Sequence, residues 1–201
     1  EPFDDVYELR VAPLLRVTPD EGWRWFVGGS LTSSGEPDAD FADTLAGGGL
    51  AGASFEITDT FRLGAALSVT TRLEGGVFVL PIPIIEWDIT DRLALRTRER
   101  GVGLEYWFTD SWNAAALVGF DRREFRLADD NAALPGGSVT DRRIPLTLAV
   151  TYSPSQKMII TARAGVELAG RLEFHDMNDR QVRETDLSEN FVAGIDARFA
   201  F

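Results

Sequence analysis

The chain lacks cysteine entirely and has a single histidine among its 201 residues. Without thiols, disulfide frameworks and thiolate metal sites are excluded. No run in the sequence approaches the ~18 apolar residues that a membrane-spanning helix needs. We also find no stretch with convincing helical periodicity. A helical membrane protein is therefore excluded.

Positive charge is scarce as well, and the formal net charge is -12. Binding to nucleic acid needs a basic face, so we expect no nucleic-acid partner. The sequence shows no signal peptide, and if the protein is exported we expect its leader to have been removed before Glu1. The length and the hydrophobic content of 44% suit one domain over residues 1–201.

A period of two recurs along nearly the whole chain. From Phe61 to Leu73 the odd positions are mostly apolar, whereas the even positions are small or polar and include two arginines. Similar alternation occurs in Tyr7–Val17, Trp23–Leu31, Leu45–Ile57, Val77–Ile89, Val102–Phe108, Trp112–Phe120, Ile144–Tyr152, Met158–Leu168 and Phe191–Phe201. This pattern predicts an all-β protein. Many segments match the ~9 to 11 residues of a strand that crosses a bilayer.

The expected connections alternate between short and long. Thr-Asp turns follow Ile57, Ile89 and Phe108, and a fourth short connection spans 153–156. Threonine and aspartate suit tight reversals because their side chains bond nearby backbone. Longer polar connections are expected at 32–44, 128–139 and 175–188. Short periplasmic turns and longer external loops are typical of an antiparallel, up-and-down transmembrane β-barrel.

Aromatic residues collect beside the short turns. Such clustering predicts a girdle at the periplasmic interface of a membrane. Because aromatic residues are common in strands, a soluble lipocalin-like barrel or sandwich remains the alternative. The expected girdle consists of Trp23, Trp25, Phe55, Phe61, Trp87, Phe108, Trp112, Tyr152, Phe199 and Phe201.

Several runs resemble a family of uncharacterised bacterial outer-membrane β-barrel proteins, namely Leu80–Leu93, Gly103–Phe108 and Phe125–Leu127. The last strand, which ends on Phe201, resembles the closing strand of such barrels. The resemblance implies location in the bacterial outer membrane, contact with its lipids, and recognition of Phe201 as an assembly signal by the barrel-assembly machinery. The family carries no established activity.

The number of strands is the next expectation. Together with the short segment Leu93–Arg98, eleven segments alternate, whereas bacterial single-chain barrels normally have an even number of strands. We expect about twelve, with one strand upstream of residue 1. Ten is the alternative, if residues 1–18 do not complete the wall.

Charged side chains follow the face opposite the apolar one, which would line the lumen. Opposite charges in a narrow barrel should pair, because an isolated charge away from water is costly. Pairing predicts a closed structural or partner-binding barrel, with a protein partner or a second copy among the candidates. The alternative is a narrow channel or porin for ions or small solutes, although no ring of one sign is evident. The expected lumen charges are Glu56, Arg62, Arg72, Glu86, Asp88, Arg96, Glu105, Arg163, Glu167, Asp196 and Arg198.

The sequence offers few residue patterns that suggest catalysis. His175 precedes Asp176 and lies upstream of Ser188, but a nucleophile needs a positioned base and an orienting acid. We interpret this pair as solvated loop residues and expect no enzymatic activity. The acidic loop residues predict a solvated rim rather than a metal site, and we expect no cofactor. These residues are Asp38, Asp40, Asp43, Asp129 and Asp130.

Overall fold

The computed structural model describes residues 5–19, 22–98, 101–155, 157–178 and 180–199. Over these residues the chain is all-β, as the alternation predicts, with no α-helix and one short 3₁₀ helix, η1 (Phe41–Thr44). No helix in this part of the chain is long and apolar enough to span a membrane.

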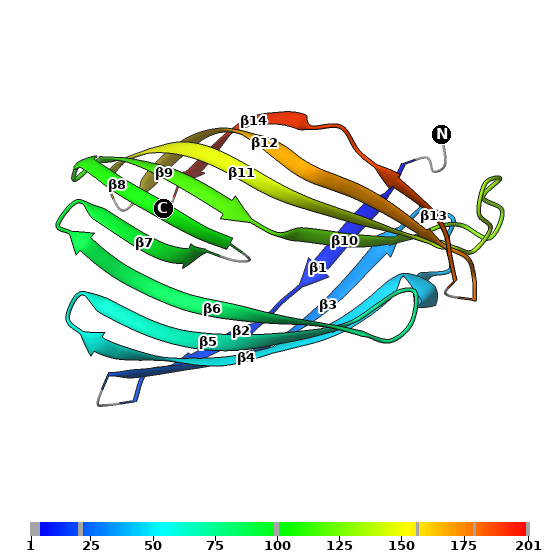
Figure 1. The fold of residues 1–201 in the computed structure, drawn as a ribbon, viewed down its shortest axis with the longest axis horizontal. Helices are drawn as coiled ribbons and strands as arrows, with labels where there is room; N and C mark the ends of the chain where they lie inside the picture. The colour runs from blue at the N-terminus through cyan, green and yellow to red at the C-terminus, as the bar shows by residue number, and fades with distance from the viewer. Residues whose placement is uncertain (1–4, 20–21, 99–100, 156, 179, 200–201) are drawn as a thin grey trace.

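Fourteen strands belong to one sheet (Figure 1). They are β1 (Tyr7–Val11), β2 (Leu14–Val17), β3 (Trp23–Gly35), β4 (Leu45–Thr58), β5 (Phe61–Thr71), β6 (Val77–Thr90), β7 (Leu93–Arg98), β8 (Gly101–Thr109), β9 (Trp112–Gly119), β10 (Asp121–Arg126), β11 (Ser138–Ser155), β12 (Met158–His175), β13 (Gln181–Asp186) and β14 (Asn190–Phe199).

Three long strands are each divided by an interruption that leaves the register unchanged. β1 and β2 both pair with β3 and are separated at Pro13, whose carbonyl oxygen still accepts from the Gly29 N–H at 3.1 Å. β9 and β10 pair with β11 on either side of Phe120, and β13 and β14 pair with β12 on either side of Leu187. These three breaks divide eleven continuous strands into fourteen, and eleven is the number of alternating segments in the sequence. The twelfth strand, expected upstream of residue 1, stays a prediction.

The sheet curves into a barrel-like shape. Its order is β1-β3-β4-β5-β6-β7-β8-β9-β11-β12-β13, with β2 beside β3 and β14 beside β12. All of these pairings are antiparallel. β10 pairs with β11 and also makes one parallel bridge to β3, between Arg126 and Gly35. This bridge closes a ring of nine strands.

The two ends of the barrel differ. Four short turns, β4–β5, β6–β7, β8–β9 and β11–β12, lie at one end, on the left of Figure 1, which we call the short-turn end. In three of them a threonine hydroxyl accepts from the N–H two residues on: Thr58 from Thr60, Thr90 from Arg92, and Thr109 from Ser111. These bonds hold the reversals that the Thr-Asp pattern predicts.

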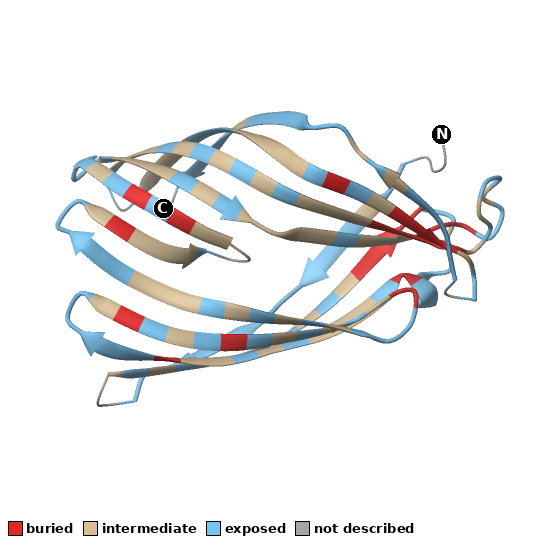
Figure 2. Ribbon diagram, in the orientation of Figure 1, coloured by how far each residue is buried: buried red, intermediate tan, exposed pale blue. Residues whose placement is uncertain are grey.

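At the opposite, narrow end the strands converge and the loops fold back. β3 and β12 extend further than expected, and β13 forms inside the segment expected as loop 175–188. A small core of Leu127, Val139 and Phe174, with Leu134 and Leu172 packed against it, fills this end. Figure 2 shows buried residues concentrated there. The longer connections are therefore partly folded structure rather than open loops.

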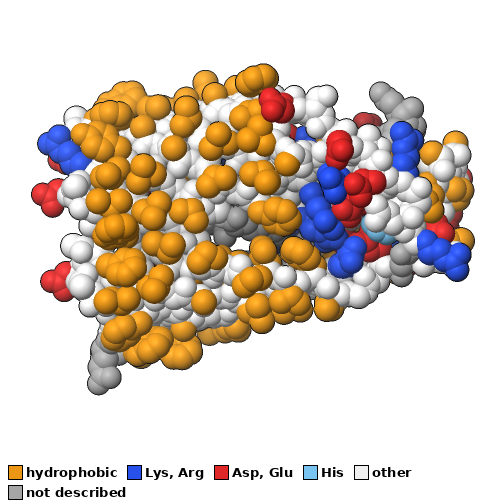
Figure 3. Space-filling model, viewed as in Figure 1, with side chains coloured by type: hydrophobic (Ala, Val, Ile, Leu, Met, Phe, Trp, Pro, Cys, Tyr) orange, Lys and Arg blue, Asp and Glu red, His pale blue; other side chains and the backbone are white. Residues whose placement is uncertain are grey.

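Alternation sorts the side chains by face over most of the sheet. On β5, Leu63, Leu67 and Val69 are exposed, whereas Arg62 and Ala66 point inward and are buried. The exposed outward side chains form a continuous apolar band beside the short-turn end (Figure 3). Its members include Leu15, Val17, Trp25, Val27, Leu63, Leu67, Val69, Val79, Leu104, Val118, Leu146, Leu148 and Val150.

Candidate functional site

Inward-facing charges form a first cluster near the short-turn end. Glu56, Arg62 and Glu86 are directly opposite one another on β4, β5 and β6, so one arginine lies between two carboxylates. Arg62 Nη2 lies 2.5 Å from Glu56 Oε2, and Arg62 Nε lies 3.7 Å from Glu86 Oε2. Arg24, on β3, donates to both oxygens of Glu86, at 2.7 and 3.0 Å. The first cluster thus balances two positive with two negative groups.

The pairing continues around the wall. Arg96 Nη2 contacts Asp88 Oδ1 at 2.6 Å, and the Arg96 guanidinium lies 5.7 Å from the centre of the Trp107 ring. Arg98 Nη2 contacts the buried Glu105 at 2.6 Å. Arg98 and Arg24 are absent from the expected lumen set, although the alternation could have found both. Arg24 lies between the outward Trp23 and Trp25, and Arg98 has the same parity as Arg96.

On β11, β12 and β14 the expected charges are paired but more accessible. Arg163 contacts Asp196, and their side chains are 52% and 57% exposed. Glu167 contacts Arg143, which also donates to Asp141 at 2.9 Å. The remaining expected charge, Arg198, is exposed on β14. Among the described strands β14 pairs with β12 alone, and most of its side chains are exposed.

A second cluster, which we call the Glu74 cluster, closes the narrow end. It comprises Arg72, Glu74, Arg122, Glu124 and His175. Glu74 lies in the β5–β6 connection, contacts Arg72, and lies 3.4 Å from Arg122 Nη2 and 2.6 Å from His175 Nδ1. Glu124 contacts Arg122 and accepts from the Leu73 N–H at 2.7 Å. These contacts fasten the β5–β6 connection to β10 and β12.

The Glu74 cluster is largely removed from water. The side chains of Glu74 and Arg122 are 3% and 7% exposed, and only Arg72 is appreciably accessible. The cluster lies in β10, the last residue of β12 and the β5–β6 connection, beyond the apolar band. Burial lowers the pKa of the Arg122 guanidinium, while the neighbouring Glu124 carboxylate opposes this by favouring the charged form. Each charge therefore depends on its partners.

His175 is buried, so its interpretation as a solvated loop residue is wrong. β12 continues to His175, which pairs with Ser138 of β11, and the β5–β6 connection covers this face. Its partner is Glu74, whereas Asp176 accepts from the N–H groups of Asn178 and Arg180. A signal was present: Arg171, Glu173 and His175 alternate with Leu172 and Phe174 in the sequence.

The aromatic residues expected as a girdle lie beside the short turns. Three cross-strand pairs face outward together: Trp23 with Phe55, Phe61 with Trp87, and Trp112 with Tyr152, at centroid distances of 5.0, 5.9 and 4.6 Å. Trp25 stacks on Trp23 at 5.3 Å. Phe108 and Phe199 are exposed, and Phe201 lies outside the described residues.

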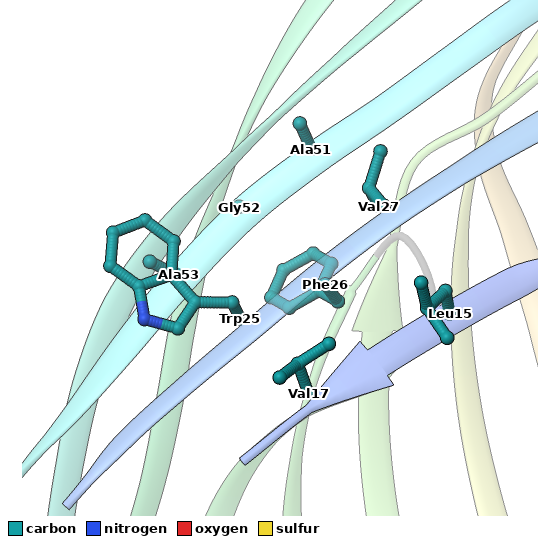
Figure 4. Close-up of a pocket in the computed structure, with 8 residues that line it drawn as sticks. All are labelled: Leu15, Val17, Trp25, Phe26, Val27, Ala51, Gly52 and Ala53. Atoms are coloured by element: carbon teal, nitrogen blue, oxygen red, sulfur yellow. The ribbon is translucent and has the colours of Figure 1, made fainter. Parts of the chain in front are cut away.

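An apolar hollow of about 460 Å³ lies against β2, β3 and β4. Figure 4 shows the β3 residues Trp25 and Val27 between the small residues of β4, Ala51 and Ala53, and the β2 residues Leu15 and Val17. Every described residue that lines this hollow is apolar or glycine.

Within the described ranges, no group of three or more histidine, cysteine or acidic side chains is placed to hold a metal ion. Asp40 instead caps η1 by accepting from the Ala42 N–H at 2.9 Å. No protein-family model matches the chain, and the comparisons with curated proteins and with solved structures found no match either.

Proposed function

We propose that the chain is a β-barrel of the bacterial outer membrane with a closed, ion-paired lumen. The observation that carries the proposal is an inverted distribution of apolar residues. Large hydrophobic side chains such as Leu148, Leu67 and Phe199 are exposed, whereas the buried apolar core is limited to a few residues, most of them at the narrow end. Exposed apolar surface of this extent marks an interface, and lipid suits a band that encircles strands.

The same distribution argues against a soluble lipocalin-like barrel. Such a barrel would place polar residues outside and an apolar cavity inside. Here the inward side carries the charged clusters and the outward side is apolar. The paired aromatics beside the short turns suit a membrane interface, where amphipathic rings are favoured. That end would face the periplasm, consistent with short turns there.

The charge pattern favours a closed barrel over a channel. Nearly every expected lumen charge has an opposite partner, and the Glu74 cluster fills the narrow end. A pore selective for one ion sign would instead present a ring of one charge. The role that follows is structural or partner-binding in the cell envelope, with bilayer lipids and the barrel-assembly machinery as partners and a protein partner or a second copy as further candidates.

The membrane location is tested by a pair of arginine substitutions at adjacent positions. Leu67 points outward and is 49% exposed, whereas Ser68 points inward. In lipid vesicles, Leu67→Arg should destabilise the fold by about 2 to 4 kcal/mol if the site lies near the midplane, because the charge would enter hydrocarbon. Ser68→Arg should cost less. Denaturant unfolding in vesicles measures both, and equal penalties would contradict a lipid-facing odd side of β5.

A further inference from the structure

The β7–β8 hairpin is shorter than its neighbours, which leaves an opening in the wall. β7 has 6 residues, whereas β6 has 14. The last β6–β7 pair toward the narrow end is Glu86 with Arg96. From Val77 to Ile84, β6 therefore pairs only with β5 among the described strands. In Figure 1 the hairpin ends well before β6 and β10 do.

An apolar hollow of about 210 Å³ occupies this opening. Leu80 and Ile82, from the inward face of β6, line it together with Val102 and Val118, which face outward as partners on β8 and β9. Residues of both faces of the sheet therefore line the hollow. Among the described residues of the lining, Thr97 contributes the one polar side chain.

The edge of β6 that faces the opening is poorly suited to pair with another strand. The Asp88 N–H donates to the carbonyl oxygen of Thr60, the residue before β5, at 2.8 Å. Backbone groups of successive residues in a strand point to opposite sides, so the even-numbered residues of β6 bond toward β5. The odd-numbered residues of β6 therefore direct their backbone groups toward the opening. Two of these, Pro81 and Pro83, have no N–H to donate. The Thr97 hydroxyl accepts from the Ile85 N–H at 3.0 Å and donates to the Pro83 oxygen at 2.8 Å.

We propose that this opening binds a single acyl chain of a bilayer lipid, an inference that rests on the proposed membrane location. An added peptide strand would find no N–H donor at two successive positions of the edge, which disfavours a protein occupant. A hydrocarbon chain needs no hydrogen bond and gains by burying apolar surface. Val118, which lines the opening, also belongs to the apolar band, and Phe78 stacks on Phe120 at 6.5 Å on the side toward the narrow end.

The absence of cysteine allows a direct test by single-site labelling. The full chain carrying Ile82→Cys, labelled with a bimane fluorophore, is folded into vesicles whose phospholipids are brominated on the acyl chains. Leu148→Cys, outward and 64% exposed, reports general lipid contact. Thr147→Cys, inward on β11, is the matched control away from the opening. Leu80→Cys provides a second reporter if Ile82→Cys does not fold.

The expected result is that brominated chains quench the label at 82 nearly as much as the label at 148, and leave the label at 147 bright. Val118→Phe, which narrows the opening, should restore the fluorescence at 82 without changing the signal at 148. An unquenched label at both 82 and 80, with quenching at 148, would overturn the acyl-chain site alone. Absence of quenching at 148 would overturn the membrane proposal.

Discussion

Neutralising Glu74 should open and destabilise the narrow end. The side chain is 3% exposed and contacts Arg72, Arg122 and His175, so Glu74→Gln keeps the shape but leaves buried positive charge with fewer partners. Removing one member of a buried ion pair costs about 3 to 5 kcal/mol. We expect unfolding in vesicles to require correspondingly less denaturant. We also expect planar bilayers that contain Glu74→Gln to conduct ions, and planar bilayers that contain the wild type to show no conductance.

The matched control is Asp196→Asn. Asp196 pairs with Arg163, and both side chains are more than half exposed, so the loss should be under about 1 kcal/mol because solvent screens the pair. The reasoning fails if Glu74→Gln and Asp196→Asn have equal effects on stability. Steady conductance of the wild type would refute the closed barrel in favour of the channel, whatever the variants do.

Two further predictions concern the last strand and the loop after β12. Phe199→Ala combined with Phe201→Ala should lower delivery to the outer membrane more than stability in detergent, because the resemblance makes Phe201 part of an assembly signal; normal surface levels would count against this. The Asp176 carboxylate accepts from the N–H groups of Arg180 and Asn178, chiefly the former, which lowers its pKa. A group with a lowered folded-state pKa stabilises the fold above its unfolded pKa. Order in residues 176–178 should therefore persist at neutral pH and be lost only as pH falls through that lowered pKa, as NMR titration of the side chain and neighbouring amides can show.

The sequence predicted the strands well because the alternation that defines a strand is carried by the residues of that strand. The alternation in Phe61–Leu73 places Leu67 outward and Arg62 inward, as the structure shows. The threonine turns likewise need only a hydroxyl two residues before an N–H. Such features are set within a few residues, so the sequence alone is enough to find them.

The narrow end was harder to predict because its contacts join distant parts of the chain. Glu74 and His175 are about a hundred positions apart in the sequence and meet only when the β5–β6 connection folds over β12. The parallel bridge from Arg126 to Gly35 is equally non-local. Alternation along a strand assigns each residue to one face of the sheet, but it does not say which strand lies opposite. Neither the contact of Glu74 with His175 nor the bridge from Arg126 to Gly35 therefore follows from it.

The inward charges supply information that the apolar alternation lacks. A slip of one residue between β4 and β5 would turn apolar side chains inward, but a slip of two would keep every side chain on its proper face. In the observed register Arg62 is opposite Glu56, and a slip of two would place Ser54 or Thr58 there instead. Arg62 is buried, so losing the Glu56 carboxylate would lower the stability of the fold. This holds even though an intact buried ion pair adds little net stability. The first cluster therefore acts chiefly to select one register, while the outward apolar residues select which face meets the surroundings.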